Sequence, residues 1–263
     1  MSKIAVVTGG SSGIGKETAL QLKAFGCTVY ELSRTGKSTD GITHITCDIT
    51  DTESVNTAIS QIIAENGKID ILVNNAGFGI SGAAEFTDIN AAKSQFDVNF
   101  FGTVRVSSAV LPYMRKAGAG RIVNLSSVAA VIPIPFQSFY SASKAAVNSY
   151  TMALGGEVKP FGIQVCAVMP GDISTGFTAA RKKEQAGDSE YAGRISRSVS
   201  KMEQDEIRGM SAKEAGRYIA KIALKNSRKP LYTLRFDYKL VALLQKILPA
   251  QLLNFIIRVL YAK

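Results

Sequence analysis

The sequence predicts an α/β fold, with a doubly wound parallel sheet covered by helices on both faces and a C-terminal helical extension. Two observations lead to this fold class. Short runs of strand character alternate with segments of helical period along most of the 263 residues, which is the pattern of parallel βαβ units. The run from residue 69 to residue 73 is wholly apolar, as expected of a strand that is covered on both faces.

The predicted elements follow one another without a long break up to about residue 175. Strands are expected over residues 3–8, 27–32, 42–46, 69–73, 121–125 and 163–168, and helices over residues 16–25, 51–66, 88–116 and 138–158. The helix at 88–116 is expected to be interrupted only near Pro112, because proline removes a helical hydrogen bond.

A glycine-rich turn follows the first predicted strand. It reads Gly9-Gly-Ser-Ser-Gly13-Ile-Gly15 and leads into a helix. Glycines let the backbone approach a ligand closely, and a helix N-terminus presents unpaired N–H groups and positive dipole charge. The spacing G-x-x-x-G-x-G differs from the commoner G-x-G-x-x-G. Its position directly after the first strand nevertheless favours a dinucleotide-binding, Rossmann-like fold.

The end of the second predicted strand indicates which dinucleotide is bound. In such folds this end faces the adenosine ribose, about 20 residues beyond the glycines. Here it reads Ser33-Arg34, a hydroxyl and a guanidinium suited to a 2′-phosphate, so NADP(H) is favoured over NAD(H). Glu31 is the competing candidate, although it falls inside the strand, and Arg34 as a solvated loop residue is the alternative. Asp48, after the third strand, is expected to accept a hydrogen bond from the adenine amino group.

Tyr140 and Lys144 are the candidate proton-transfer residues. Positions four apart share one face of a helix, so the phenol and the ammonium are expected to point into the same space. A free phenol has a pKa near ~10, and a neighbouring ammonium is expected to lower it enough for acid–base work. Ser127, at the end of the run 121–127, can offer a hydroxyl to the same substrate oxygen. Taken alone, such a Tyr/Lys pair is more often a solvated helix face.

Asparagines mark two further positions. Asn74-Asn75-Ala76-Gly77 follows the fourth strand, at the same sheet edge as the glycine turn, where ligands of open α/β sheets lie. Asn99 lies in the middle of a predicted helix among apolar residues, where its amide competes with the backbone. We therefore expect Asn99 to have a function other than solvation.

Composition excludes several other classes of protein. The formal net charge is +10, which would suit an anionic ligand or surface, but no Lys/Arg run exceeds three residues, so no nucleic acid is expected. Cys27, Cys47 and Cys166 are far apart and lie in or beside apolar runs, which indicates core thiols in a reducing compartment. His44 is the single histidine, so no metal site is expected. The N-terminus has no signal-like segment, and a cytoplasmic location is expected.

Taken together, these motifs resemble the short-chain dehydrogenase/reductase family, in particular its single-domain members with a TGxxxGIG turn. The motifs appear in the family's order and spacing from about residue 3 to residue 175. They are Thr8-Gly9-x-x-x-Gly13-Ile14-Gly15, Asn74-Asn75-Ala76-Gly77, Asn99, Ser127, Tyr140-x-x-x-Lys144 and Pro170-Gly171-x-Ile173-x-Thr175.

The resemblance implies a role for each of these residues. Tyr140 would be the general acid/base, Ser127 would orient the substrate oxygen, Lys144 would lower the Tyr140 pKa and bind the nicotinamide ribose, and Asn99 would hold a water that links Lys144 to solvent. The implied cofactor-binding residues are Gly9, Ser11, Ser12, Gly13, Ile14, Gly15, Ser33, Arg34, Asp48, Ile49, Asn75, Ala76, Gly77, Tyr140, Lys144, Pro170, Gly171, Ile173 and Thr175.

The two segments after the last motif carry the substrate signal. We predict a catalytic domain over residues 1–235, with a basic segment at about 176–210 that is either a substrate lid or a solvated helix pair. Residues 236–263 are predicted to form amphipathic helices broken at Pro249. They would close an apolar pocket, pack against a second subunit, or make peripheral membrane contact through 238–263. Apolar pocket walls are expected from Phe78, Ile80, Ile132, Ile134, Pro135 and Phe136.

The leading hypothesis is an NADP(H)-dependent oxidoreductase that interconverts a secondary alcohol and a ketone. The tail resembles that of hydroxysteroid dehydrogenase-like and other lipid-active members, which favours a hydrophobic, steroid-like or lipid-like substrate. The alternatives are an NADP(H)-binding scaffold or regulator without turnover and a reductase of a small non-lipid carbonyl. The resemblance also implies a homodimer or homotetramer that pairs through the helices after Asn90 and Ser138.

Overall fold

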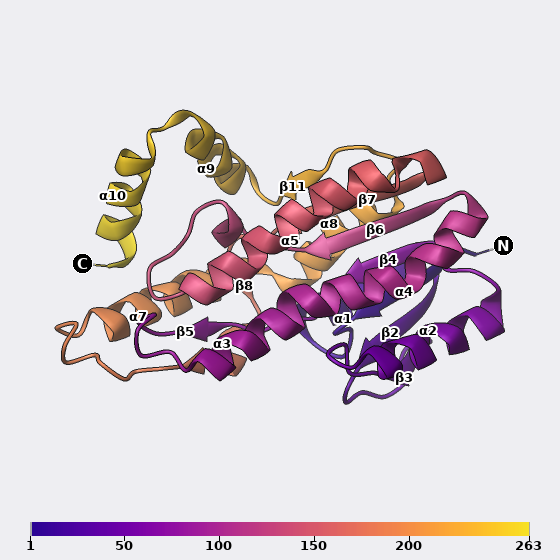
Figure 1. The fold of residues 1–263 in the computed structure, drawn as a ribbon, viewed down its shortest axis with the longest axis horizontal. Helices are drawn as coiled ribbons and strands as arrows, with labels where there is room; N and C mark the ends of the chain where they lie inside the picture. Colours follow the sequence, from indigo (N-terminus) through magenta and orange to yellow (C-terminus); the bar gives the residue numbers. More distant parts are fainter. Residues whose placement is uncertain (1, 263) are drawn as a thin grey trace.

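A parallel sheet forms the centre of the computed structural model, which describes residues 2–262 (Figure 1). Within those residues the sheet has seven strands in the order β11-β7-β6-β4-β1-β2-β3. The strands are β1 Ile4–Thr8, β2 Thr28–Ser33, β3 Thr43–Thr46, β4 Ile71–Asn74, β6 Gly120–Leu125, β7 Ile163–Met169 and β11 Leu231–Thr233. The order reverses at β1, which pairs with both β2 and β4. The predicted fold class is confirmed, and β11 is a strand that the sequence patterns did not indicate.

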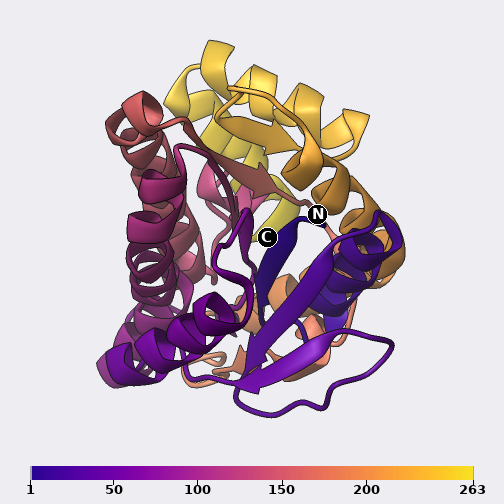
Figure 2. The same ribbon diagram turned by 90° about the vertical axis from the view of Figure 1, so that its right-hand side faces the viewer.

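Helices cover both faces of this sheet, as Figure 2 shows from the end of the molecule. On one face, Val6 and Leu32 pack with side chains of α2, α4 and α5 in a single buried cluster. On the other face, Ala5 and Val7 pack with α1 and α8. These helices are α1 Gly13–Ala24, α2 Thr52–Asn66, α4 Gly102–Ala117, α5 Ser138–Glu157 and α8 Ala212–Leu224. Because consecutive strand residues point to opposite faces, two-sided burial explains why the strand sequences are continuous apolar runs.

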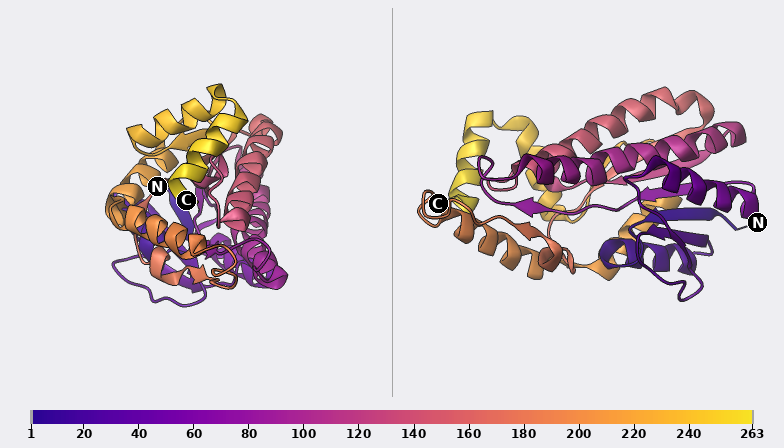
Figure 3. Two further views of the ribbon diagram at one scale, coloured as in Figure 1. Left: turned by 90° about the vertical axis from the view of Figure 1, so that its left-hand side faces the viewer. Right: turned by 60° about the horizontal axis from the view of Figure 1, so that its bottom comes forward.

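Additional elements extend beyond the carboxyl ends of the strands (Figure 3). They include two short strand pairs, β5 Ile80–Ser81 with β9 Lys182–Lys183 and β8 Ile173–Ser174 with β10 Met210–Ser211. The helices in this region are α3 Ile89–Phe96, α6 Phe177–Ala180, α7 Arg194–Ile207, α9 Phe236–Ile247 and α10 Ala250–Tyr261. No helix within residues 2–262 combines the length and the apolar character that crossing a membrane requires.

The long helix predicted at 88–116 is interrupted at a different place from the one expected. Pro112 lies inside α4 without ending it, so the prediction of a break near Pro112 is wrong. The change of register is a π-helical turn, Asp97–Phe101, between α3 and α4. Single π turns inside helices are frequent at functional sites, and this one contains Asn99.

The glycine turn is too tightly packed to accept a side chain at Gly15. A Cβ atom there would lie 2.2 Å from the Gly9 carbonyl oxygen and 2.3 Å from the Asn75 amide nitrogen. Gly9 itself has a φ of 64°, a backbone conformation that favours glycine. The sharp turn between β1 and α1 therefore depends on these glycines.

We expect Gly15→Ala to lower the free energy of unfolding by about 1–3 kcal/mol, because the loop must move to relieve the overlap. Gly156→Ala is the matched control: a Cβ at Gly156 in α5 meets nothing within 4 Å. That change is expected to stabilise by about 0.5–1 kcal/mol. Urea denaturation of both variants measures the difference, and equal effects would contradict this description of the turn.

Candidate active site

Tyr140, Lys144 and Ser127 converge at the carboxyl end of β6. Tyr140 and Lys144 lie one turn apart on α5, and the Lys144 ammonium is 5.9 Å from the centre of the Tyr140 ring. Ser127 lies two residues after the end of β6, close enough to the Tyr140 phenol to act on its pKa. The Ser127 hydroxyl also accepts a bond from the backbone N–H of Ala129 at 3.1 Å, which fixes its position. The structure thus brings these three predicted residues together.

Lys144 is one of the most buried charged groups of the protein. Only 5% of its surface is exposed, and its ammonium donates a hydrogen bond to the Leu125 carbonyl oxygen at 2.7 Å. Burial lowers its pKa to about 8, so the side chain still carries its charge at neutral pH. A second bond, from the Ser126 hydroxyl to the Lys144 carbonyl oxygen at 3.0 Å, joins the same turn of α5 to the end of β6.

The Tyr140 pKa does not move in the expected direction. Burial raises it to about 12, while the hydrogen bond from Ser127 and the charge of Arg181 act to lower it. The expectation that the Lys144 ammonium leaves Tyr140 with a lowered pKa is therefore wrong for the free protein. The physical reason is that loss of hydration penalises the phenolate by more than the surrounding dipoles and charges stabilise it.

Asn99 is held in place by the chain that follows β4. Its carbonyl oxygen accepts from the backbone N–H of Phe78 at 3.0 Å, and its amide nitrogen donates to the Phe78 carbonyl oxygen and to the Ser143 hydroxyl. Both amide hydrogens are therefore used within the protein. A Cβ at Gly77 would lie 3.0 Å from Asn99 Oδ1 and 3.4 Å from Lys144 Nζ, so these two polar groups meet beside Gly77.

The glycine turn lies at the same edge of the sheet, and Asn75 secures it. The Asn75 amide nitrogen donates to the carbonyl oxygens of Thr8 and Gly9. In return, the Thr8 hydroxyl accepts from the backbone N–H groups of Asn75 and Ala76, at 3.0 and 3.1 Å. Asn75 therefore shapes the turn from behind. Ser11 and Ser12 are exposed on its outer side, and the Ser12 side chain makes no capping bond to α1.

The end of β2 holds both candidates for the adenosine ribose. Arg34 is exposed just beyond the strand, and its charge is one of the causes that lower the pKa of Asp48, after the larger effect of the Thr50 backbone N–H. Glu31 is buried beneath Gly10. One of its carboxylate oxygens contacts the His44 ring and accepts a hydrogen bond from the Ser33 hydroxyl. The other oxygen has no partner among the described residues. The exposed Arg34 guanidinium and the buried Glu31 carboxylate thus lie near the same end of β2.

Other predicted cofactor residues have structural contacts. The Asp48 carboxylate accepts two bonds from Thr50, and the Ile49 side chain points at Gly102 of α4. Across the glycine turn, a Cβ at Gly13 would lie 3.8 Å from Thr175 Cβ, so the 170–175 segment closes over the turn. Ile173 is buried in β8, and the Pro170 carbonyl oxygen accepts from the backbone N–H of Val128.

Phe177, Arg181 and Glu206 form a contact over Tyr140 that the sequence patterns did not single out, and we call it the Phe177 latch. The Phe177 ring of α6 packs on Tyr140 with 5.9 Å between ring centres, and the Arg181 guanidinium lies over Phe177 and pairs with Glu206 of α7. Thr178 also donates to the Glu206 carboxylate. The segment predicted as a lid or a solvated helix pair thus lies directly on the tyrosine. Nothing in the local sequence separates Glu206 from the other acids of α7, so only the fold identifies it.

A second covering contact comes from α9. The Tyr238 ring occupies the space that a Cβ at Gly171 would need, and the Tyr238 hydroxyl is bonded to the Asp172 carboxylate. Burial raises the pKa of both Tyr238 and Asp172. The C-terminal extension is therefore attached to the motif 170–175 rather than separate from the site.

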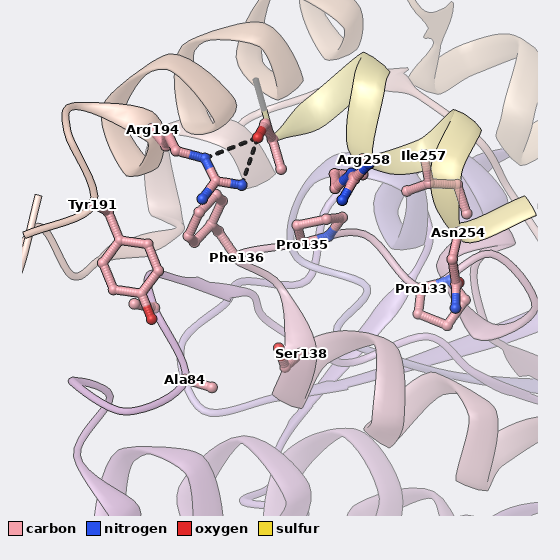
Figure 4. Close-up of a pocket in the computed structure, with 12 residues that line it drawn as sticks. Ala84, Pro133, Pro135, Phe136, Ser138, Tyr191, Arg194, Asn254, Ile257 and Arg258 are labelled. Carbon is pink, nitrogen blue, oxygen red and sulfur yellow. Dashed lines mark hydrogen bonds between the residues drawn. The ribbon is translucent and has the colours of Figure 1, made fainter. Parts of the chain in front are cut away.

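A pocket of about 390 Å³ opens beside these elements, between α10, the start of α7 and the loop before α5 (Figure 4). Pro135 and Phe136, two of the predicted wall residues, line it together with Ile257. Arg194 also lines it, and its guanidinium donates two bonds to the Ala262 carbonyl oxygen. The loop that forms this wall runs into α5 and ends at Gln137, three residues before Tyr140.

The residues at this edge fit a dinucleotide with a reactive nicotinamide. The turn leaves no space for side chains at Gly9 and Gly15 and presents the start of α1, which has no acidic residue in its first turn. Such a backbone cradle suits a pyrophosphate. The buried Lys144 and the half-buried Tyr140 lie at the same edge of the sheet, where ligands of open α/β sheets bind.

Comparisons with known proteins agree with this geometry. The family model described as short chain dehydrogenase matches residues 3–186. A protein of Bacteroides thetaiotaomicron named 3-ketodihydrosphingosine reductase is 42% identical, over 99% of this chain and 98% of that protein. A short-chain dehydrogenase structure from Streptomyces avermitilis has a TM-score of 0.83 at 30% identity, covering 94% of this chain and 93% of that one.

A further structure, described as ElxO with NADP bound, has a TM-score of 0.76 at 26% identity and covers 91% of this chain and 99% of that one. The family match spans well over half of the sequence, and it includes the glycine turn, Asn99, Ser127, Tyr140 and Lys144. The chain belongs to the short-chain dehydrogenase/reductase family and is an oxidoreductase acting on CH–OH groups.

Proposed function

We propose that this protein is an NADPH-dependent reductase of a long-chain, lipid-like ketone. The observation that carries the proposal is the placement of the protonated Tyr140 phenol beside Ser127 and Lys144, under the Phe177 latch and at the sheet edge of the glycine turn. Family membership supplies the reaction class, and the elements around the site support the finer assignments.

The chemistry follows from the protonation states. With its pKa at about 12, Tyr140 holds its proton at neutral pH, which is the form that ketone reduction needs. When bound, the reduced nicotinamide supplies the hydride to the carbonyl carbon, and the carbonyl oxygen gains negative charge. Ser127 donates a hydrogen bond to that oxygen and stabilises the charge. Tyr140 then transfers its phenolic proton to the oxygen, which completes the alcohol.

Lys144 and Asn99 act on this step indirectly. The Lys144 ammonium, bonded to the Leu125 carbonyl oxygen, places a positive charge near the phenolate that remains after proton transfer. Its other hydrogens would bind the hydroxyls of the nicotinamide ribose. Asn99 fixes the Phe78 backbone beside Lys144. Both hydrogens of the Asn99 side-chain amide are used. Asn99 would therefore hold a water only by accepting a hydrogen bond, at Oδ1 or at its main-chain carbonyl oxygen.

Two features support the lipid-like substrate. The pocket beside α10 has apolar residues in its wall, among them Pro135, Phe136 and Ile257, and a relative matched over 98% of its length is named 3-ketodihydrosphingosine reductase. A steroid-like ketone and a small non-lipid carbonyl are the competing substrates. For the cofactor, the exposed Arg34 guanidinium at the end of β2 supports NADP(H).

Assembly and location complete the proposal. Exposed large apolar side chains of α3, the π turn before α4, and α5 support pairing of subunits through this face into a homodimer or homotetramer. They are Ile89, Phe101 and Met152. We also propose that the catalytic domain ends at about residue 235, that the protein is cytoplasmic, and that residues 238–263 make peripheral membrane contact.

Tyr140→Phe is the direct test of turnover. The variant keeps the ring and its packing but removes the proton, so NADPH consumption with a panel of long-chain ketones, steroids and small carbonyls is expected to fall by roughly 10²–10⁴-fold. NADPH binding, measured by its fluorescence, is expected to change little. Wild-type protein that binds NADPH but consumes it with no carbonyl would instead support the scaffold hypothesis.

The cofactor assignment rests on Arg34. Arg34→Ala removes the proposed partner of the 2′-phosphate, so the dissociation constant is expected to rise at least roughly tenfold for NADPH, with little change for NADH. Isothermal titration with both cofactors gives the two values. Arg235→Ala, which removes an exposed arginine paired with Asp237, is the control for net charge. Equal losses for both cofactors in Arg34→Ala would refute the assignment.

A further inference from the structure

The apolar stripes of the two C-terminal helices point away from the protein. In α9 the stripe comprises Phe236, Leu240, Leu243, Leu244 and Ile247, whose exposed fractions run from 39% to 80%. These positions recur with helical spacing on one face, and no residue of α9 is buried. In α10 the stripe comprises Leu252, Phe255, Ile256 and Leu260, with exposed fractions from 39% to 56%.

Their inner faces are already in contact with the protein. Tyr238 covers Gly171 and is bonded to Asp172. Leu253, Ile257 and Tyr261 pack on a cluster that includes Ile132 and Met169. The helices are therefore positioned by one side and leave the more apolar side uncovered, which is the reverse of an ordinary surface helix. Exposed apolar surface of this extent indicates an interaction surface.

The charge around these stripes identifies the partner. The segment from residue 225 to residue 262 carries a single acidic residue, Asp237, and its basic residues are all exposed. Arg235 directly precedes α9, Lys239 and Lys246 lie on α9, and Arg258 lies on α10, so these four border the stripes, whereas Lys225, Arg228 and Lys229 lie before β11. An apolar face with a basic border matches a surface that offers hydrocarbon beneath negative charge, as an anionic bilayer does. A second copy of the segment would bring like charges together.

The helix α10 also forms a wall of the pocket. Asn254, Ile257, Arg258 and Ala262 line the pocket (Figure 4), whereas the exposed Phe255, Ile256 and Leu260 are not among its lining residues. The two sets of residues belong to the same helix, so whatever surface covers α10 lies next to the pocket. A lipid that leaves that surface has only the width of one helix to pass before it reaches the pocket.

We propose that the outer faces of α9 and α10 dock on an anionic lipid bilayer and that this contact delivers a membrane-dissolved substrate to the pocket beside α10. The docking follows from the exposed stripes and their charge alone, while the delivery step rests on the proposed ketone reductase function. The two short helices lie in the plane of the interface, with the basic side chains at the level of the lipid headgroups.

The test compares two double variants of the full chain. Leu243→Glu/Phe255→Glu places acids on both stripes, at side chains that are each 54% exposed, so folding is expected to be unaffected. Phe25→Glu/Tyr218→Glu makes the same chemical change at exposed positions outside the segment. Binding is measured by flotation with phosphatidylcholine vesicles with and without equimolar phosphatidylglycerol, and subunit number by light scattering.

Wild type and the control are expected to float with the anionic vesicles, and the Leu243→Glu/Phe255→Glu variant to bind at least roughly tenfold less. Salt at about 0.5 M is expected to weaken wild-type binding, because it screens the basic border. Failure of wild type to float would overturn the proposal. So would a wild-type oligomer that dissociates in the variant without any vesicle binding, because the stripes would then be a subunit interface.

Activity separates the docking from the enzymatic function. With NADPH, reduction of a long-chain ketone dissolved in anionic vesicles is expected to fall at least roughly tenfold in the variant, while reduction of water-soluble 2-octanone stays unchanged. Equal rates of wild type and variant on the vesicle-borne ketone would overturn the delivery step. Vesicle binding without reduction of either ketone would uphold the docking and contradict the proposed function.

Discussion

The hydrogen bond from Lys144 to the Leu125 carbonyl oxygen holds the site together. A buried ammonium must be paired, because an unpaired charge in the interior is costly. This bond gives one of the three ammonium hydrogens a partner and fixes α5 against the last residue of β6, with help from the bond between Ser126 and Lys144. Since Ser127 follows β6 and Tyr140 precedes Lys144 by one turn, the same attachment determines the distance between the phenol and the serine.

Exclusion of water governs the chemistry of that site. The Phe177 latch and the C-terminal extension cover the carboxyl edge of the sheet from two sides, and burial shifts the pKa of Tyr140 upward and that of Lys144 downward. The free protein therefore holds a neutral phenol beside a cation. A substrate carbonyl that enters this region meets hydrogen-bond donors in a medium with little water, where their effect on a developing charge is largest.

Local signals predicted much of this arrangement. The strand–turn–helix order identified the glycine turn, and the four-residue spacing placed Tyr140 and Lys144 on one face, because both patterns depend only on neighbours in sequence. The mid-helix position of Asn99 predicted a function other than solvation but not the π turn in which it lies, and the predicted break at Pro112 falls within a continuous helix. The fold class and family followed from the order of these motifs.

Other features depend on contacts between distant parts of the chain and could not be predicted. Three contacts each join residues at least 13 positions apart. They are the Arg181–Glu206 pair of the Phe177 latch, the Tyr238–Asp172 contact and the Glu31–His44 pair. The predicted direction of the Tyr140 pKa shift was wrong for the same reason. The sequence shows that an ammonium is near, but the amount of water removed by Phe177 becomes known only once α6 is placed against α5.

The pKa of Tyr140 tests most directly whether burial under Phe177 keeps this phenol neutral. In protein labelled with ¹³C at the tyrosine ring, Tyr140→Phe identifies the Tyr140 signal. We expect that signal to stay in the neutral form at about pH 10.5, where exposed phenols with pKa near ~10 have largely ionised. In Phe177→Ala, which readmits water, its pKa is expected to fall. A Tyr140 that ionises at or below the usual range in the free protein, or that is unaffected by Phe177→Ala, would contradict the account.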